Sequence, residues 1–388
     1  MRETPRVAAV GVGYSATGRK LGLTSRQLAV QACNAAMADA GAEPRDIDGI
    51  AVLWNPAGPA PPGLDEVNAL DLAQMMGYVP VNWHVDGVGP AYIGPALQAI
   101  AAIRAGFCHT CMTVRVINQR LSGSDLQAGA DETPASGDEQ FTRPFGQLLP
   151  LQAIAAMPMQ RHMAVYGTTE EQFAQHAVAQ RHHATLNEDA IFRDPLTIED
   201  FLATPYLSTP LRILDCDYPV DSGSAVIYTT EERARDLRQK PVFVESAACS
   251  GMGYMAFEIE DMVRNAPFHT GEQLWERTDL SPADVDCAQL YDGFSIITFQ
   301  WLEGLGFCAP GESGPFIEAG NTRLGGSLPL NTDGGACNVG RRHGTNFCIE
   351  SVRQIRGQCG ARQVPDANVS VWANAVGPFG GAVLMIGE

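Results

Sequence analysis

The arrangement of apolar and polar residues between positions 84 and 106 predicts a strand, a tight turn and a helix. A β-branched lead-in enters the glycine-rich stretch 84–91, and Leu97, Ile100 and Ile103 then recur at three-residue intervals until Gly106. At such a turn, free backbone N–H groups and the positive end of a helix suit an anion or an enolate oxygen. The alternative is an ordinary strand-to-helix connection, because isolated glycine-rich turns are common.

The first 53 residues predict a strand, a helix and a second strand. Residues 6–12 alternate β-branched and small side chains, which is typical of a strand. Thr24 or Ser25 can cap the following helix, and Gly41 ends it. The segment 43–53 then predicts a turn that leads into the next strand.

Two patterns occur twice along the chain, in the same order. Residues 281–291 repeat the turn and strand of residues 43–53, with Pro282 in the place of Pro44. A helix that ends in Ile-Arg-Ala-Gly in the first part is echoed by one that ends in Gln-Ile-Arg-Gly near the C-terminus. The repetition indicates a duplicated α/β unit.

The duplication divides the chain into two halves. We expect one copy in residues 1–237 and the other in residues 238–388. Residues 119–210 lie between the repeated patterns, as an insertion in the first half. Insertions of this length commonly line a ligand site or a subunit interface.

Composition and charge exclude several classes of partner. The chain is 45% hydrophobic and 18% charged, and its formal net charge of -18 leaves no basic stripe for nucleic acid. No apolar run of about 18 residues predicts a membrane span, and no signal-peptide pattern opens the sequence, so a cytoplasmic location is the default expectation.

The ten cysteines are scattered, which fits buried free thiols in a reducing compartment. Cys108 and Cys111 form a CxxC pair without a second pair at zinc spacing. Core packing therefore explains them better than metal or redox use, and we expect no metal site.

Tyr291 stands where a strand of the second half meets the next helix. Ligands of α/β sheets collect at the carboxyl ends of strands, so this tyrosine is well placed for acid–base chemistry. The alternative is an aromatic residue that fills the top of the core with its hydroxyl hydrogen-bonded. Asp292 is predicted to cap a helix rather than to act as a base.

Two further glycine-rich segments carry candidate ligand groups. In the stretch 330–344, Arg341, Arg342 and His343 crowd into one turn, which is costly unless they meet solvent, an acidic partner or a ligand. The stretch 372–385 predicts a strand, a glycine loop and a last strand. Such loops bring backbone N–H groups close to a substrate.

The order of these segments resembles the thiolase superfamily, in its sterol-carrier-protein-type, lipid-transfer-protein-like branch. The resemblance covers nearly the whole chain, and its most specific pieces are residues 187–217, 289–320, 328–335 and 352–357. It implies an α/β thiolase fold, in which two similar βαβαβαββ halves pack as five layers, α-β-α-β-α. It also implies a tight homodimer.

The sequence departs from the thiolases at each of the four positions that carry their chemistry. By the resemblance, the nucleophilic cysteine falls on Gly89, the two histidines fall on Tyr291 and Arg341, and the second cysteine falls on Asn374. A chain without these groups cannot form the acyl-cysteine intermediate, so Claisen condensation by the usual route is excluded.

Steroid side-chain aldolases resemble thiolases and depart from them in the same way. They lack the nucleophile and cleave a carbon–carbon bond of a β-hydroxyacyl-CoA by a retro-aldol reaction. Tyr291 matches the tyrosine of their YD motif, whereas Arg341 stands where they can carry a second tyrosine. The resemblance therefore implies an aldolase that needs no cofactor besides the CoA of its substrate.

For this chemistry we expect Tyr291 to be the proton-transfer group, its phenol acidified by Arg341. His343 is a reserve candidate for the base. The predicted groups that hold the thioester oxygen or the enolate are Gly87, Gly89, Asn374, Gly377, Gly380 and Gly381.

The resemblance also implies a partner, a small OB-fold protein or domain joined to a zinc ribbon, and hence a heteromeric complex. Two other functions remain open on the residues alone. One is an acyltransferase that uses a nucleophile other than the family's cysteine. The other is a non-catalytic subunit that binds acyl-CoA or acts as a scaffold.

Overall fold

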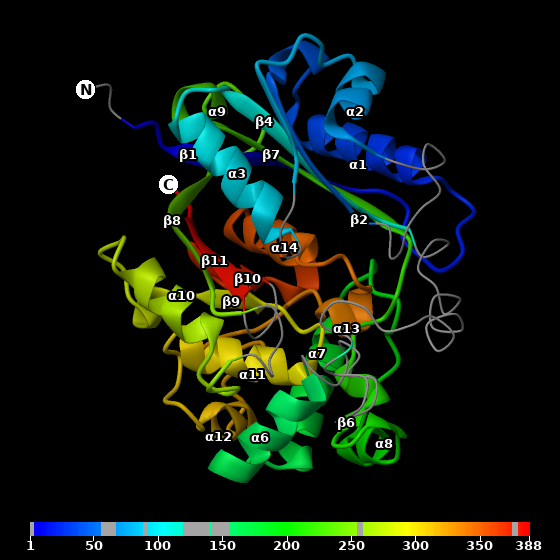
Figure 1. Cartoon of the computed structure of the whole chain (residues 1–388), viewed down its shortest axis with the longest axis vertical. Coiled ribbons are helices and arrows are strands. Elements are labelled where there is room, and N and C mark those ends of the chain that lie inside the picture. Colours follow the sequence, from blue (N-terminus) through cyan, green and yellow to red (C-terminus); the bar gives the residue numbers. More distant parts are fainter. Residues whose placement is uncertain are drawn as a thin grey trace.

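The computed structural model describes residues 4–55, 67–87, 92–118, 140, 155–253, 259–374 and 379–388. Within these ranges, helices surround a nine-stranded sheet with the strand order β3-β2-β4-β7-β1-β8-β11-β10-β9 (Figure 1). The sheet contains both parallel and antiparallel neighbours. This mixed α/β architecture confirms the predicted fold class.

The first half follows the order strand, helix, strand, helix, strand, helix, strand, strand. Its strands β2, β3 and β4 are parallel neighbours, whereas β7 runs antiparallel to both β4 and β1. The elements are β1 (Val7–Tyr14), α1 (Ser25–Ala40), η1 (Pro44–Asp46), β2 (Gly49–Asn55), α2 (Ala69–Met76), β3 (Trp83–Asp86), α3 (Ile93–Arg104), β4 (Thr110–Ile117), β7 (Ser222–Thr230) and α9 (Glu231–Ala234).

The second half repeats this plan with a reduced third strand. In its place, Leu330 forms a single parallel bridge to Ala288. The elements are β8 (Val242–Gly251), α10 (Ala266–Trp275), η6 (Pro282–Asp284), β9 (Cys287–Leu290), α11 (Ser295–Gly304), α12 (Ser313–Glu318), α13 (Ala336–Val339), α14 (Thr345–Ile355), η7 (Gly360–Arg362), β10 (Val369–Asn374) and β11 (Phe379–Ile386).

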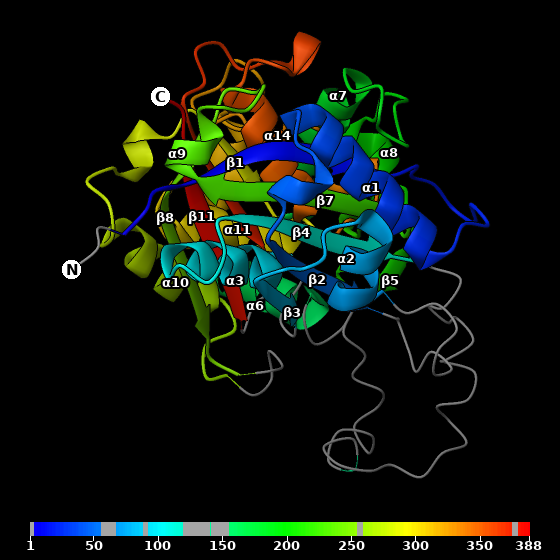
Figure 2. The ribbon, with the colours of Figure 1, turned by 90° about the horizontal axis from the view of Figure 1, so that it is seen from above.

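The two halves meet at β1 and β8, which pair through only two residue pairs. Helices α3 and α14 lie between the two sets of strands and contact strands of both halves, while α1 and α10 cover the outer faces (Figures 1 and 2). Seen along this direction, the layers are helices, strands, the pair α3 and α14, strands, and helices. Residues that approach the centre from either half therefore meet at the two inner helices.

The sequence signals for α1 and for the repeated turns are found where they were predicted. Thr24 caps α1 with a capping box, and Gly41 ends the helix in the left-handed conformation with φ 69°. Pro44 and Pro282 each begin a 3-10 turn before a strand. On β1, an added Cβ at Gly13 would lie 2.6 Å from Ala32 O, so glycine lets α1 pack directly on the strand.

The insertion in the first half forms its own helices and packs against the second half. Helix α7 contacts α11, α12 and α13. The described part of the insertion comprises α6 (Met157–Tyr166), α7 (Glu170–Thr185), α8 (Ile198–Leu202), β5 (Tyr206–Ser208), β6 (Leu211–Arg212) and η4 (Ile213–Asp215). Since α7 borders the segment that precedes α14, the insertion covers one side of the region where the candidate residues meet.

All ten cysteines are free thiols, including the buried Cys108 and Cys111. No helix in the described part of the chain has the length and apolar character needed to cross a bilayer. No group of three or more His, Cys, Asp and Glu side chains in those ranges could hold a metal ion.

Candidate active site

Tyr291 directly follows β9, and its backbone is fixed on both sides. Its N–H donates to Ala373 O of β10 at 3.1 Å, and its carbonyl accepts from Thr298 Oγ1 at 3.2 Å. The preceding Leu290 is paired by the side chain of Asn331, which accepts from its N–H at 2.7 Å and donates to its carbonyl at 2.8 Å. The direction in which the tyrosine leaves the strand is therefore set by the fold.

The Tyr291 ring is packed on two sides and is 7% exposed. It meets Phe347 edge-on with 6.0 Å between the ring centroids, and it lies against the backbone of Gly293. No hydrogen-bond partner of its hydroxyl lies among the residues that the structure describes. The phenol is therefore held in place by packing, which leaves the hydroxyl available to a ligand.

Arg341 pairs with Asp217 from the end of the insertion. Nε and Nη2 of Arg341 lie 2.8 and 2.7 Å from Asp217 Oδ1, and the carboxylate is buried. The carboxylate holds the pKa of Arg341 above its usual value. Charge at this position is therefore balanced within the protein.

This pairing changes the electrostatics of Tyr291. Burial, and then repulsion by Asp217, raise the pKa of the Tyr291 phenol well above its ordinary value, while Arg341 and Arg115 lower it less. Arg341 therefore lowers the pKa of this phenol, in the expected direction, but by less than burial and Asp217 raise it. Tyr291 is a neutral hydroxyl at pH 7.

His343 lies just before the start of α14, and its backbone is in the left-handed conformation with φ 48°. Its carbonyl accepts from Tyr92 N–H, at the start of α3, at 2.9 Å. Its Nδ1 contacts Nη2 of Arg115. Burial, and then the charges of Arg115 and Arg341, hold the pKa of His343 well below its usual value, so its ring is neutral at pH 7.

Arg115 is the functional candidate that the sequence reasoning missed. It lies in β4 and is 1% exposed. Its signal was a single cationic side chain in a strand that otherwise consists of apolar, cysteine and hydroxyl residues. Only the folded chain shows that this strand faces His343.

Asn374 ends β10 and is fully buried. Its Oδ1 accepts from Ile93 N–H, the first residue of α3, at 3.3 Å. Its Nδ2 has no hydrogen-bond partner among the described residues and lies beside Gly344, where an added Cβ would be 2.2 Å away. A buried amide donor without a partner suits an oxygen atom of a bound ligand.

Those glycines predicted to hold the enolate that the structure describes are placed differently from what was expected. Gly87 donates its N–H to Val52 O at 2.7 Å, so this group is already used. Gly380 and Gly381 belong to β11 and have partners in β8, so they are not part of a loop. Gly89 and Gly377 lie outside the described residues.

Asp292 caps a helix, as predicted, but the helix is α13 rather than α11. Its carboxylate accepts from the N–H groups of Ala336 at 2.8 Å and Cys337 at 3.3 Å. Burial raises the pKa of Asp292 to about 7. The residue thus fixes the glycine-rich segment that leads to Arg341.

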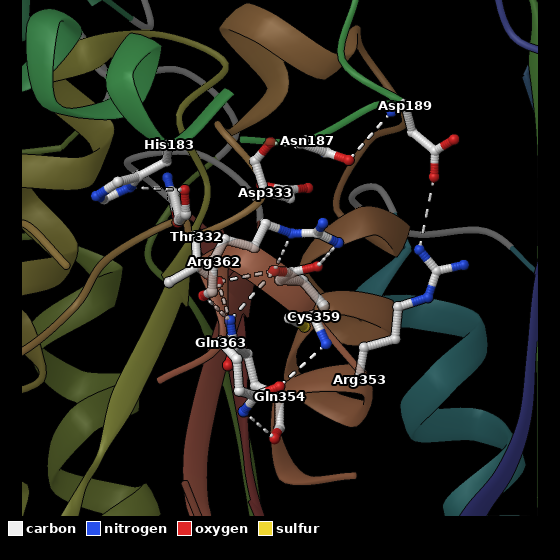
Figure 3. A network of polar contacts seen from close by, with 12 residues as sticks. His183, Asn187, Asp189, Thr332, Asp333, Arg353, Gln354, Cys359, Arg362 and Gln363 are labelled. Atoms are coloured by element: carbon white, nitrogen blue, oxygen red, sulfur yellow. Dashed lines mark hydrogen bonds and ion pairs between the residues drawn. The ribbon is translucent and has the colours of Figure 1, made fainter. Parts of the chain in front are cut away.

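A buried polar network supports this segment from behind (Figure 3). Glu350 of α14 accepts from Arg362 Nε at 2.9 Å and from Thr332 Oγ1 at 2.8 Å. Gln354 donates to Thr332 Oγ1 at 2.9 Å. Because removing one member of a buried ion pair costs about 3–5 kcal/mol, the network fixes α14 relative to Thr332 in the glycine-rich segment.

Comparison with known proteins identifies the family. A model of the thiolase C-terminal domain-like family matches residues 250–387. A steroid side-chain-cleaving aldolase of Thermomonospora curvata is 34% identical, with 99% of both chains covered. A 17-hydroxy-3-oxo-4-pregnene-20-carboxyl-CoA lyase of Mycobacterium tuberculosis is 34% identical over 91% of this chain and 92% of its own. The chain belongs to the thiolase superfamily, in its aldolase branch.

Solved structures agree with this assignment. An Ltp2-ChsH2(DUF35) aldolase superposes with a TM-score of 0.88 and 32% identity over 99% of both chains. A human mitochondrial 3-ketoacyl-CoA thiolase superposes with a TM-score of 0.72 at 14% identity over 99% of both chains, which shows the fold alone. The predicted family and the enzyme class, a carbon–carbon lyase of thiolase-like fold, are confirmed.

In this thiolase-like aldolase, the described candidates gather where the inner helices begin. Tyr92 N–H, at the start of α3, bonds His343 O just before α14, and Ile93 N–H bonds Asn374 Oδ1 at the end of β10. Tyr291 interacts electrostatically with Arg115 and Arg341, and so does His343. The site therefore combines a neutral phenol, a neutral imidazole, an amide donor and two cations at the positive ends of two helices.

Proposed function

We propose that this enzyme cleaves a β-hydroxyacyl-CoA of the steroid side-chain type by a retro-aldol reaction, giving a ketone and a shorter acyl-CoA. The observation that carries the proposal is the neutral Tyr291 phenol beside the Arg341–Asp217 pair, at a position where a thiolase uses a histidine. The names of the two relatives at 34% identity support the same reaction class and a steroid acyl group.

The reaction breaks the bond between the α and β carbons of the acyl chain. The β-hydroxyl loses its proton and becomes the ketone, while the electron pair of the broken bond forms a thioester enolate. Because the resting phenol of Tyr291 is protonated, both proton transfers belong to one step: as the carbon–carbon bond breaks, the phenol donates its proton to the α carbon and accepts the proton of the β-hydroxyl in exchange. No net proton is consumed, and no covalent intermediate is needed.

The site must stabilise the negative charge that develops on the thioester oxygen during the reaction. Asn374 Nδ2 is a buried donor that has no partner in the described part of the chain, and the N-termini of α3 and α14 add their positive ends. Each donor aimed at such an oxygen is worth about 3 kcal/mol. This arrangement would replace the enolate-binding glycines that the sequence suggested.

We expect the enzyme to act in a heteromeric complex with an OB-fold and zinc-ribbon protein and to form a homodimer. The solved Ltp2-ChsH2(DUF35) aldolase, by its title, combines a chain similar to this one with a DUF35 component, which supports the first expectation. The apolar side chains Leu70 and Met75 of α2 are 48% and 46% exposed next to the edge strand β3, which supports the second.

The test is a turnover assay of the chain co-expressed with its OB-fold partner. The substrate is a CoA thioester whose β-carbon is a steroid ring carbon with a tertiary hydroxyl. Release of a ketone and a shorter acyl-CoA, abolished by Tyr291→Phe and kept by Tyr78→Phe, is the expected result. Tyr78 is a suitable control because it is also buried, but its hydroxyl bonds Met37 Sδ in the outer core. Full turnover by Tyr291→Phe would overturn the assignment.

An acyltransferase is the second candidate, because an acetyl-CoA acetyltransferase of Methanothermobacter thermautotrophicus is 30% identical over 98% of both chains. One thiol near this site is Cys337, whose Sγ donates to Asp292 O at 3.2 Å. Burial and the nearby carboxylates raise its pKa well above the usual value, which disfavours the thiolate that attack requires. An acyl-enzyme trapped and detected by mass spectrometry would favour this candidate.

A further inference from the structure

Arg115 is a buried cation for which the described part of the chain provides no carboxylate partner. Its Nη1 donates to the carbonyls of Leu53 and Val116 at 3.1 and 3.2 Å, and its Nε has no partner within the described ranges. An unpaired buried charge is expensive, so its retention calls for a function. Such a charge is useful where negative charge develops during a reaction.

The strand directs Arg115 toward the inner helices. Side chains alternate along β4, so Arg115 shares a face with Thr113, whose hydroxyl lies 2.7 Å from Tyr92 Oη at the start of α3. Its Nη2 reaches Nδ1 of His343, at the start of α14. The guanidinium thus lies at the junction of the two helix N-termini.

The contact decides the protonation state of His343. A guanidinium stays charged and can only donate, so Nδ1 of His343 is the acceptor. Burial lowers the pKa of Arg115 only to about 10, which keeps it protonated at pH 7. A neutral imidazole that accepts at Nδ1 carries its hydrogen on Nε2. Its free nitrogen is therefore a donor and cannot serve as a base.

We propose that Arg115 is a positioning residue, which fixes His343 as the neutral Nε2–H tautomer and makes it a hydrogen-bond donor to the anionic oxygen of the reaction. The catalytic part of this inference rests on the proposed retro-aldol function. In this proposal His343 is a hydrogen-bond donor, and not the alternative base that the sequence suggested. The left-handed backbone of His343, held by the bond from Tyr92 N–H, keeps the ring against Arg115.

The first experiment measures the tautomer in the wild-type enzyme. Histidine ring nitrogens are labelled with ¹⁵N, and the His343 signals are assigned by their loss in His343→Gln. We expect an unprotonated, hydrogen-bonded Nδ1 and a protonated Nε2 at pH 7. A ring protonated on Nδ1, or on both nitrogens, would overturn the proposal without any assay of activity.

The second experiment measures kcat and KM on the same steroid β-hydroxyacyl-CoA. We expect Arg115→Met to lower kcat about 100-fold, the size found for loss of one oxyanion donor, with KM changed by less than about threefold. Arg115→Lys can still donate to Nδ1, so its kcat should be about tenfold higher than that of Arg115→Met. A kcat of Arg115→Met within twofold of wild type would contradict the proposal.

Arg356→Met is the matched control. The Arg356 side chain is also 1% exposed, but it pairs with Asp39 at 2.9 Å, just beyond the opposite end of α14. It should change stability and leave kcat of the folded enzyme within about twofold. If the wild type does not cleave the substrate, the proposed function is wrong, and so is the role of His343 as a donor to the anionic oxygen. The tautomer measurement still decides whether Arg115 sets the tautomer of His343.

Discussion

The phenol of Tyr291 lies so close to Gly293 that an added Cβ at Gly293 would stand 2.5 Å from Tyr291 Oη. No side chain fits at that distance, so the position of the hydroxyl depends on a glycine two residues along the chain. The glycine is itself tied to the site, because its carbonyl accepts from Asp217 N–H at 3.1 Å.

The first prediction concerns this contact. Gly293→Ala should displace the phenol by about an ångström and lower kcat about 10- to 100-fold, because small misplacements of a reacting group are costly. Steady-state kinetics and a thermal melt check this prediction. Gly251→Ala is the control, since the nearest atom to its added Cβ is 4.0 Å away. An unchanged kcat in Gly293→Ala would mean that the hydroxyl position does not matter.

The second prediction concerns the charge next to the phenol. Asp217→Asn removes a negative charge that raises the pKa of Tyr291, and it leaves Arg341 free to lower that pKa. The alkaline limb of the kcat profile, and the ultraviolet titration of the tyrosine, should both move to lower pH. Asp189→Asn is the control, because this exposed carboxylate lies 3.8 Å from Arg353 and away from Tyr291. Profiles that coincide with wild type would refute the coupling.

The third prediction concerns stability and pH. Burial raises the pKa of Asp292 from 3.8 to about 7, so between these values the folded state binds more protons than the unfolded state. This group therefore makes the free energy of unfolding fall as pH rises through that window, by up to about 1.4 kcal/mol per pH unit.

Asp292→Asn removes this titration and keeps an acceptor for Ala336 N–H. Its stability relative to wild type should increase steadily from pH 4 to pH 7, as measured by urea unfolding at several pH values. Asp236→Asn, at an exposed position, should show no such trend. A constant difference between Asp292→Asn and wild type would show that the buried carboxyl is already ionised at pH 4.

The fourth prediction concerns the expected homodimer. Leu70→Glu together with Met75→Glu places two charges on the exposed side of α2, beside the edge strand β3. Light scattering after gel filtration should show a dimer for the wild type and a monomer for this variant. Val165→Glu, at a 44% exposed site on α6, should leave the dimer intact. A dimer that survives the double substitution would place the interface elsewhere.

The sequence by itself determined the elements and the family. The cap at Thr24, the stop at Gly41 and the prolines at positions 44 and 282 act through near neighbours, so a local pattern suffices to predict them. The long motif around Tyr291 was enough to indicate the thiolase-like fold. The residues at the four positions that carry thiolase chemistry excluded Claisen condensation by the usual route. Tyr291, at the carboxyl end of β9, was identified as a candidate from the same motif.

Only the tertiary structure decided the electrostatics of the site. Arg115 and His343 are 228 residues apart in sequence, and Asp217 and Arg341 are 124 apart, so no local pattern connects them. Burial, and then Asp217, raised the pKa of Tyr291 more than Arg341 lowered it, and the backbone bond of Gly87 removed a predicted donor. Burial and charge pairing depend on which distant segments come into contact, and these contacts exist only in the folded chain.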